Sequence, residues 1–188
     1  MTAILQLKVF VDGIMPRIWR RFLVKDTSTF HDLHKALQVL FGWSDSHLYA
    51  FYVAKEELGI PDDFRENFLN AKKIRLKDKL SLKQKFGYVY DFGDNWEHVL
   101  TVEKAFDAKD AAPVPRCVGG ERSGPPEDCG SYPGYYSLME IQKNKKHPDY
   151  QERIVEWLGT DFDFEHFDIG EINKELLTLA KKRAGRNR

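Results

Sequence analysis

The order of local patterns, with strand-like segments first and helix-like segments last, most constrains what this chain can fold into. Largely apolar or alternating runs typical of strands occupy residues 4–11, 18–24, 48–53, 88–92 and 96–106. Helical periodicity follows at residues 135–145, 150–158 and 171–184. This segregation predicts an α+β fold with a mostly antiparallel sheet and a C-terminal group of helices.

One helix interrupts the strand-like half of the chain. Residues 29–32 have the form of a capping box, with aspartate in place of the usual glutamate. The apolar stripe that follows comprises Leu33, Leu37, Leu40 and Phe41. Gly42 is a typical helix stop, so one helix is expected directly after the first hairpin. The polar residues 56–73 are expected to form a loop or short helices.

The length and charge of the chain bound its organisation. With 188 residues, 42% of them hydrophobic, the chain fits one domain. We expect a sheet-rich part (residues 1–106), a loop rich in proline, glycine and cysteine (107–134) and a helical part (135–188). Lys and Arg total 29, as do Asp and Glu, so the net charge is zero. Any contact with nucleic acid must therefore be a local patch, and the case for it is weak.

Targeting signals are not apparent in the sequence. The first residues lack the basic flank and apolar run of a signal peptide, and no stretch approaches the roughly 18 apolar residues of a membrane span. Two cysteines without an export signal are typical of a reducing compartment. We expect a cytoplasmic protein without membrane contact.

The hairpin formed by residues 88–106 admits two registers. A three-residue turn places Tyr90 opposite His98 and sets the like charges of Asp91 and Glu97 against each other. A two-residue turn instead places Asp91 opposite His98, as a carboxylate–imidazole pair. The sequence does not choose between these registers.

Either register collects polar groups on one hairpin beside an aromatic face that includes Trp96. The polar candidates are Asp91, Asp94, Glu97 and His98. Turn chemistry alone also explains aspartate and asparagine in this position. The hairpin is therefore interpreted either as an ordinary turn or as a binding surface.

Cys117 and Cys129 are separated by eleven residues, without the closely spaced cysteine pair that zinc sites usually use. Together with His98, and with His147 or His166, they would hold zinc or another divalent metal only through the tertiary fold. The alternative is a pair of reduced, non-ligating cysteines. Arg122 lies nearby and would favour a thiolate, but no base for a catalytic cysteine is identified.

The rigid, acidic segment before Cys129 is expected to bind an arginine. Strand alternation points Arg20 and Arg21 to opposite faces of the sheet, so one of them lies over apolar surface. Glu127 and Asp128 follow two prolines and would provide its carboxylate partner. We predict that Arg20 or Arg21 pairs with Glu127 or Asp128.

The hairpin and the cysteine loop are predicted to converge on one concave site. Only the rest of one strand and a short Pro/Ala-rich stretch separate them. Tyr135 and its neighbours Tyr132 and Tyr136 would line the resulting cleft with aromatic surface. At the far end of the chain, Lys181, Lys182 and Arg183 indicate either a nucleic-acid tail or cations that complement a helix dipole.

Read together, several segments resemble the plasmid pRi ORF-three-like family. The matching segments include residues 16–21, 41–48, 90–98, 117–122, 125–130 and 162–167. The resemblance implies a small α+β domain found in plasmid- and transposon-borne genes, without an established activity or catalytic residues. The family's usual cysteine is replaced by Gly124, which weakens the case for a cysteine metal site.

Three functional hypotheses follow. The first is a non-enzymatic binding or accessory module, for a protein partner among others, with the hairpin and cysteine loop as its working surface. The second is a divalent-metal-dependent enzyme that uses the polar groups of the hairpin. The third is a DNA-binding accessory protein that uses Arg17, Arg20, Arg21 or the basic C-terminal end.

Overall fold

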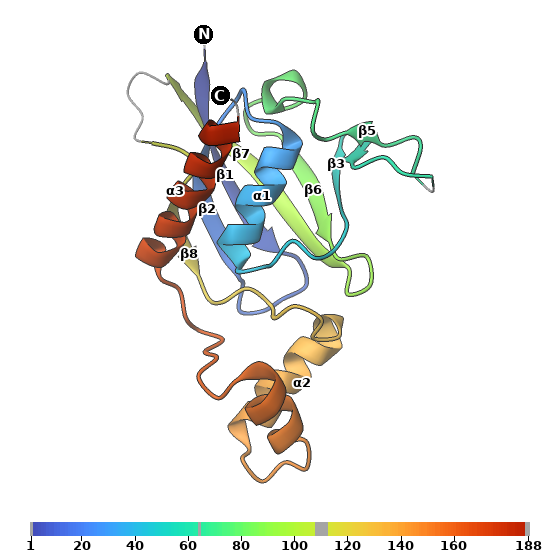
Figure 1. Ribbon diagram of the computed structural model, residues 1–188, viewed down its shortest axis with the longest axis vertical. Helices are drawn as coiled ribbons and strands as arrows, with labels where there is room; N and C mark the ends of the chain where they lie inside the picture. The colour runs from blue at the N-terminus through green and yellow to red at the C-terminus, as the bar shows by residue number, and fades with distance from the viewer. Residues whose placement is uncertain (1, 64, 108–112, 187–188) are drawn as a thin grey trace.

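A computed structural model describes residues 2–63, 65–107 and 113–186 of the chain (Figure 1). Its centre is an eight-stranded sheet with the order β5-β4-β3-β6-β7-β1-β2-β8, antiparallel throughout except between β4 and β5. The strands are β1 (Ala3–Val11), β2 (Trp19–Lys25), β3 (Tyr49–Val53), β4 (Glu56–Gly59), β5 (Leu69–Asn70), β6 (Lys85–Tyr90), β7 (Trp96–Asp107) and β8 (Arg116–Glu121). The predicted α+β class is confirmed.

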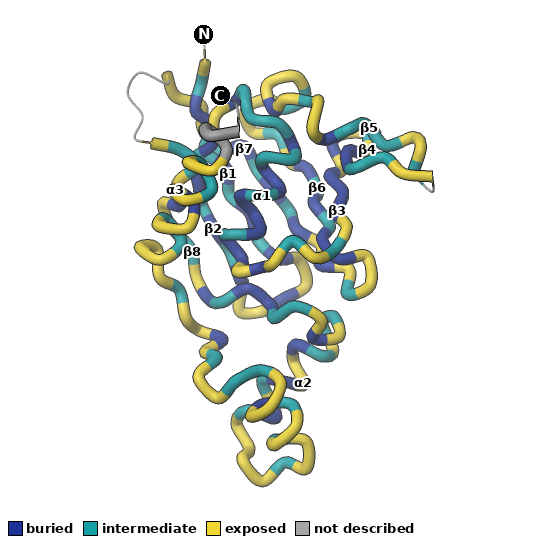
Figure 2. The backbone as a smooth tube through the Cα atoms, viewed as in Figure 1, coloured by how far each residue is buried: buried dark blue, intermediate teal, exposed yellow. Residues whose placement is uncertain are grey.

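The helices form two groups. They are α1 (Phe30–Phe41), the short turn η1 (Leu76–Asp78), α2 (Ser131–Lys143), the π-helical segment η3 (Tyr150–Leu158) and α3 (Ile169–Arg186). Helices α1 and α3 lie against the same face of the sheet, whereas α2 and η3 form a helical lobe beyond its end (Figure 1). Much of the outer surface of this lobe is exposed (Figure 2). Within the described residues, no helix is both long and apolar enough to cross a membrane.

Helix α1 begins and ends where the sequence predicts. Thr29 and Asp32 form the reciprocal capping box, and Gly42 ends the helix with a φ of 77°. The predicted stripe is buried and packs on the sheet. The same core includes Leu7 and Phe22 of the strands beneath the helix. Burial of this stripe fixes which face of the sheet is the core.

Strand alternation separates the two arginines of β2 as expected. Arg20 lies on the buried face with 2% exposure, and Arg21 lies on the opposite, partly exposed face. The same alternation runs through β1 and β7, where buried and half-buried residues succeed each other. One face of the sheet is thus covered by α1 and α3, and the other remains partly exposed.

The register of the β6–β7 hairpin differs from both predictions. Tyr90 pairs with Trp96 and Tyr88 with His98, which leaves residues 91–95 as a five-residue loop. Asp91 leaves the ladder because its φ is 56° and its N–H donates to the Leu48 carbonyl. Asp91 therefore opposes neither Glu97 nor His98.

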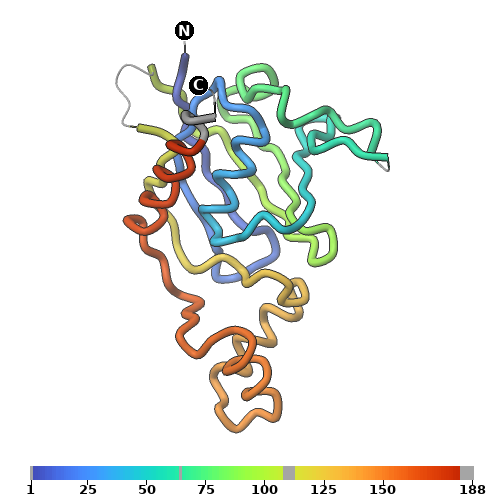
Figure 3. The backbone as a smooth tube through the Cα atoms, in the orientation of Figure 1, coloured from blue at the N-terminus to red at the C-terminus, as the bar shows by residue number. Residues whose placement is uncertain are grey.

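The long loop predicted at residues 107–134 is also shorter than expected. Its middle forms β8, an edge strand that pairs with β2, and its end forms the first turn of α2. Residues 108–112 of this segment lie outside the described part of the chain. After β8 the chain runs past the end of the sheet to the hairpin loop before it enters α2 (Figure 3). Similarly, residues 56–73 contain β4 and β5 instead of a loop or helices.

Candidate functional site

Asp45 folds the connection between α1 and β3 back onto α1. Its φ is 62°, in the left-handed region that aspartate tolerates better than most residues. Its carboxylate is bound by His34 and Lys35, and its N–H donates to Gln38 Oε1 at 2.8 Å. These contacts fix the position from which His47 extends.

A buried polar network lies beneath this connection. His34 is 1% exposed, its Nδ1 lies 2.8 Å from the Tyr88 hydroxyl, and its ring stacks on Tyr49 at a centroid distance of 3.6 Å. Burial lowers the pKa of His34, against the opposing influence of Asp45. Burial would raise the pKa of Asp45, but hydrogen bonds from His34 and Lys35 lower it to about 2. Protein groups thus satisfy this network.

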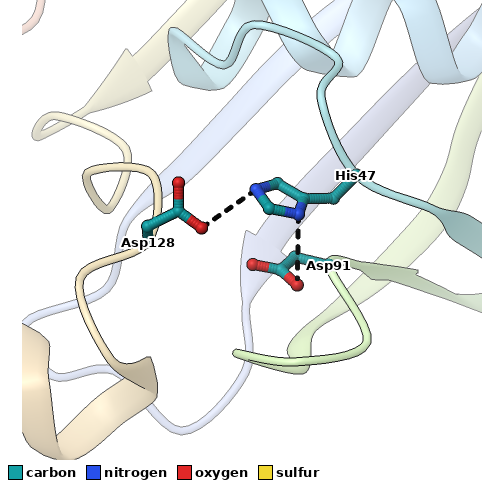
Figure 4. A group of neighbouring side chains, drawn as sticks. All are labelled: His47, Asp91 and Asp128. Atoms are coloured by element: carbon teal, nitrogen blue, oxygen red, sulfur yellow. Dashed lines mark ion pairs between the residues drawn. The ribbon is translucent and has the colours of Figure 1, made fainter.

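Asp91 supplies the buried carboxylate of the candidate site. It is 6% exposed, and its Oδ1 accepts a hydrogen bond from the Gly93 N–H at 2.9 Å. The same oxygen lies 3.6 Å from His47 Nδ1 (Figure 4). Like Asp45, Asp91 lies in the left-handed region, with a φ of 56°, and this turns the chain out of the strand.

The segment that precedes α2 brings further carboxylates to the same place. The Trp43 indole donates to the Pro125 carbonyl at 2.8 Å and holds this segment against the α1–β3 connection. Glu127 Oε1 accepts from the Ser44 N–H at 2.7 Å and from the Tyr90 hydroxyl at 3.0 Å. Burial and the charge of Glu127 raise the pKa of Tyr90 to about 12, so the tyrosine remains a donor.

These groups surround the imidazole of His47. Its Nε2 lies 3.1 Å from Asp128 Oδ1 and 3.6 Å from Glu127 Oε2. Although Nε2 is buried and close to Asp128, the two atoms are not oriented as a hydrogen bond, so Nε2 has no hydrogen-bond partner. Potential ligand atoms of His47, Asp91 and Asp128 all lie within 4.8 Å of one another, the only such group in the described part of the chain.

The charge of this cluster is unbalanced. Three carboxylates face one imidazole, and no lysine or arginine among the described residues lies within 4.0 Å of their oxygens. A bare imidazole nitrogen that faces carboxylate oxygens is unfavourable unless a proton or a metal cation lies between them. The geometry therefore favours a proton or a metal cation at His47 Nε2.

The predicted arginine clamp on Glu127 or Asp128 is wrong. Arg20 instead donates to four backbone carbonyls, those of Trp19, Leu40, Glu121 and Arg122, at 2.6–2.8 Å. Arg21 forms a two-point pair with Glu103 on the other face of the sheet. Because several carbonyls converge at the end of α1 and β8, backbone acceptors replace the expected carboxylate. Buried in this way, Arg20 is also unsuited to contact DNA.

Arg122 and Tyr135 join the helical lobe to the sheet. The Arg122 guanidinium lies 2.6 Å from Glu165 and donates to the Pro16 carbonyl at 2.7 Å. Tyr135 is fully buried and packs edge-on against Trp96 at a ring distance of 6.4 Å. Arg122 therefore holds two connections together through polar contacts, whereas Tyr135 and Trp96 pack α2 against the sheet.

The proposed metal set of Cys117, Cys129 and His98 does not assemble. Cys117 lies in β8 beside α3, where its N–H donates to Asn173 at 2.8 Å, and Cys129 precedes α2. Burial raises the pKa of both thiols, that of Cys129 to about 12, which disfavours the thiolate that metals bind. Burial also lowers the pKa of His98 to about 4, and its ring packs against aromatic residues.

Two other hairpin candidates, Asp94 and Glu97, make their contacts outside the cluster. Asp94 accepts hydrogen bonds from the Gly130 N–H at 3.1 Å and, through its carbonyl, from the Ser131 hydroxyl at 2.6 Å. Glu97 is exposed and accepts a hydrogen bond from Asn95. The hairpin loop and the segment before α2 are thus in contact, with Asp94 holding the start of α2.

A cavity of about 590 Å³ lies elsewhere, between α1 and α3. Its lining includes Val24, Lys25, Lys35, Ala36, Leu179 and Lys182. The first-turn N–H groups of α1 beside it are already bonded, since those of Phe30 and His31 donate to backbone carbonyls. We place the candidate site at the His47 cluster because, among the described residues, only this group combines converging ligand atoms with a buried imidazole nitrogen that lacks a hydrogen-bond partner.

Sequence reasoning missed His47 and Ser44. Both lie in residues 41–48, a segment that entered only as part of the family resemblance. The available signal was a polar run directly after a helix stop, a common position for binding residues. Asp91 and Asp128 were named, but with other partners.

Comparison with known proteins identifies the family. Residues 3–171 match the model described as plasmid pRiA4b ORF-3-like protein. The chain belongs to this family. It is similar to the uncharacterised protein y4hQ of Sinorhizobium fredii (strain NBRC 101917 / NGR234), with 32% identity over 190 residues that cover 99% of this chain and 97% of y4hQ. It is also similar to the crystal structure of MM3350 from Methanosarcina mazei Go1, a protein of unknown function, with 36% identity, a TM-score of 0.83 and coverage of 91% of this chain and 98% of MM3350.

Gly124, where the family resemblance leads us to expect a cysteine, lies against the end of α1. A Cβ atom at this position would lie 2.1 Å from the Phe41 carbonyl oxygen. A cysteine would therefore require the segment to shift away from the end of α1.

Proposed function

We propose that this pRiA4b ORF-3-like protein is a binding module whose working site is a divalent-metal centre at His47, Asp91 and Asp128, with Glu127 beside it. The observation that carries the proposal is the buried Nε2 of His47, which has no hydrogen-bond partner although the imidazole lies among three carboxylates. A divalent cation would satisfy this nitrogen and offset the excess negative charge together.

The donor set favours zinc. Calcium and magnesium prefer sites made of oxygen atoms alone, whereas imidazole together with carboxylates suits zinc and, less strongly, manganese. His47 Nε2, Asp128 and Glu127 would supply ligands on the exposed side. Asp91 would supply another, or would accept a hydrogen bond from Nδ1 and orient the ring.

The surroundings of the cluster support a built site. Ser44 and Tyr90 hold Glu127, while the Asp45 network fixes the connection that carries His47. Such supporting contacts are typical of metal sites, where they orient the ligands and raise affinity.

The proposal is tested by metal content and thermal stability. Protein purified without chelator, or loaded with zinc and desalted, should carry one metal ion per chain, whereas His47→Ala and Asp128→Asn should not. Zinc at about 100 times its Kd should stabilise the wild type by roughly 2.7 kcal/mol, and EDTA should reverse this.

The chain offers a matched control. His147 and Asp149 form another histidine–aspartate pair, at 3.8 Å, outside the cluster. His147→Ala and Asp149→Asn should bind zinc as the wild type does. Equal zinc loss in both pairs of variants, or no zinc in the wild type, would contradict the metal centre.

A second candidate is a zinc-dependent hydrolase. The Asp128 side chain is 67% exposed, so a metal beside it would be accessible, with a position left for water. Zinc-loaded protein should then hydrolyse an activated ester or phosphate, and Asp128→Asn, but not Asp149→Asn, should abolish this. If hydrolysis with zinc-loaded protein were no faster than in buffer, the hydrolase would be excluded and the binding module would remain as the proposed function.

We also propose that the module works in the cytoplasm, in association with plasmid- or transposon-borne genes. Cys117 and Cys129 are both free thiols, which supports a reducing compartment. The association with mobile elements is supported by the family alone.

A further inference from the structure

The face of the sheet opposite α1 and α3 carries an apolar, largely aromatic row that crosses five strands. Its members, from β2 through β1, β7 and β6 to β3, are Trp19, Phe10, Val99, Gly87 and Tyr52. Each is paired with the next in the ladder, so their side chains point to the same side. Tyr52 is 39% exposed, and Trp19, Phe10 and Val99 are half-buried.

A second row, two residues further along the strands, is cationic. Arg21, Lys8, Thr101 and Lys85 are cross-strand neighbours on β2, β1, β7 and β6. The two rows lie about 7 Å apart because two strand residues span that distance. Arg21 is neutralised by Glu103, whereas neither Lys8 nor Lys85 has an ion-pair partner among the described residues.

Cations also contact the aromatic rings themselves. Lys8 lies 5.0 Å and Arg21 5.5 Å from the centre of the Trp19 ring, and Arg17 lies 4.6 Å from that of Phe10. A flat ligand that stacked on the Trp19 ring would displace Lys8 or Arg21 from the ring to the edge of the ligand. If the edge of the ligand carried a negative charge, the displaced cation would contact that charge while the ligand stacked on Trp19.

We infer that this open sheet face binds single-stranded nucleic acid. Bases would stack on Trp19, Phe10 and Tyr52, and phosphates would lie along Lys8, Lys85 and Arg17. An exposed sheet with aromatic side chains beside cations is suited to unpaired bases, whose ring faces are accessible, and not to a duplex, whose bases are stacked on each other.

Charge favours nucleic acid over a second copy of this chain. Two copies placed face to face would bring unpartnered lysines and Arg17 into the same interface, where burial of like charges is costly. A polyanion with flat bases complements the aromatic residues and the lysines at the centre of the face, whereas Glu121 beside Trp19 and Glu57 beside Tyr52 would keep phosphates away from its two ends. The zero net charge of the chain is compatible with a local cationic row.

The test is fluorescence anisotropy with labelled 12-nucleotide oligothymidine, oligouridine and a 12-base-pair duplex at low salt. Both single strands should bind at least about ten-fold more tightly than the duplex, with affinity falling as salt rises. A preference between the two strands would report on the 2′-hydroxyl.

Trp19→Ala should weaken single-strand binding by about ten-fold, and Trp19→Phe should retain most of it, because stacking on one aromatic residue contributes 1–3 kcal/mol. Trp157, which is 44% exposed on the helical lobe and also has an arginine over its ring, is the matched control. Trp157→Ala should bind as the wild type does. Circular dichroism would establish that each variant is folded.

Lys8→Gln should weaken binding and reduce the slope of log affinity against log salt concentration by about one, because one fewer counterion is released. Lys146→Gln, on the helical lobe, should change neither the affinity nor the slope. Three results would overturn the inference: no binding of either single strand, equal binding of the duplex, or equal losses for Trp19→Ala and Trp157→Ala. Self-association of the wild type in sedimentation velocity that Trp19→Ala abolishes would instead assign the face to a second copy. None of these outcomes depends on metal, so this inference and the metal centre can fail separately.

Discussion

Two histidine–aspartate groups lie on either side of the same connection, and they differ in how well the protein satisfies them. The His34–Asp45 group is bound by Lys35, Tyr88 and Gln38, so each of its polar atoms has a protein partner. The His47 group has three carboxylates around an imidazole whose Nε2 accepts and donates nothing. The same residue types therefore form a satisfied network in one place and an unsatisfied one in the other, and the proposed ligand belongs to the unsatisfied group.

The largest expected difference between these two groups is in the free energy of unfolding. His34→Gln should lower the free energy of unfolding by about 2 kcal/mol, because glutamine cannot satisfy both Asp45 and Tyr88 in this buried network. His47→Gln, measured without metal, should cost less than about 0.5 kcal/mol, as for weak, partly exposed ion pairs. Urea unfolding of both variants would measure this. Equal losses of unfolding free energy would mean that His47 stabilises the fold as much as His34 does, and the two groups would then not differ.

A third histidine, His98, should make the free energy of unfolding depend on pH. Because burial lowers the folded-state pKa of His98 to about 4, the unfolded state binds a proton that the folded state excludes. Stability from this residue is fully present above about pH 6.5 and falls as the pH drops toward 4, by about 3 kcal/mol in all. Urea unfolding between pH 4 and 7 should show this slope.

The slope should be reduced in His98→Gln, which has no titrating ring at this position. His147→Gln, at a partly exposed histidine, is the control and should keep the slope of the wild type. If His98→Gln retains the full slope, burial of His98 is not its cause.

The smallest expected effect is on the support of the candidate site. Tyr90→Phe removes one donor to Glu127 but keeps the ring that stacks on Trp43. It should lower the free energy of unfolding by about 1 kcal/mol or less and weaken zinc binding by about ten-fold. Calorimetric titration with zinc would measure the affinity, with Tyr136→Phe as a control. A tighter zinc complex in Tyr90→Phe would show that Glu127 is not held for the metal.

The sequence predicted those parts of the fold that depend on local chemistry. The capping box at Thr29, the stop at Gly42 and the alternation that separates Arg20 from Arg21 are all present, because each depends on a few adjacent residues. The hairpin register was wrong because it depends on Asp91 and its loop adopting a left-handed conformation, which glycine would have signalled and aspartate does not.

The candidate site was only partly predictable. His47, Asp91 and Asp128 come from three separate connections that strand pairing brings together, so no spacing in the sequence indicates their contact. One of Arg20 and Arg21 was expected over the core, and in the structure it is Arg20. Backbone carbonyls have no sequence signature, and a carboxylate was therefore named as its partner. Tertiary backbone acceptors and contacts between distant loops account for both errors.

The central claim, that the His47 cluster holds a metal and the His34 network does not, is tested most directly by anomalous X-ray scattering at the zinc edge from crystals grown with zinc. We predict one anomalous peak about 2.0–2.2 Å from His47 Nε2 and from an oxygen of Asp128, with no peak beside His34 or Asp45. A zinc-saturated crystal without a peak at His47, or with its peak at Cys117 or Cys129, would contradict the account.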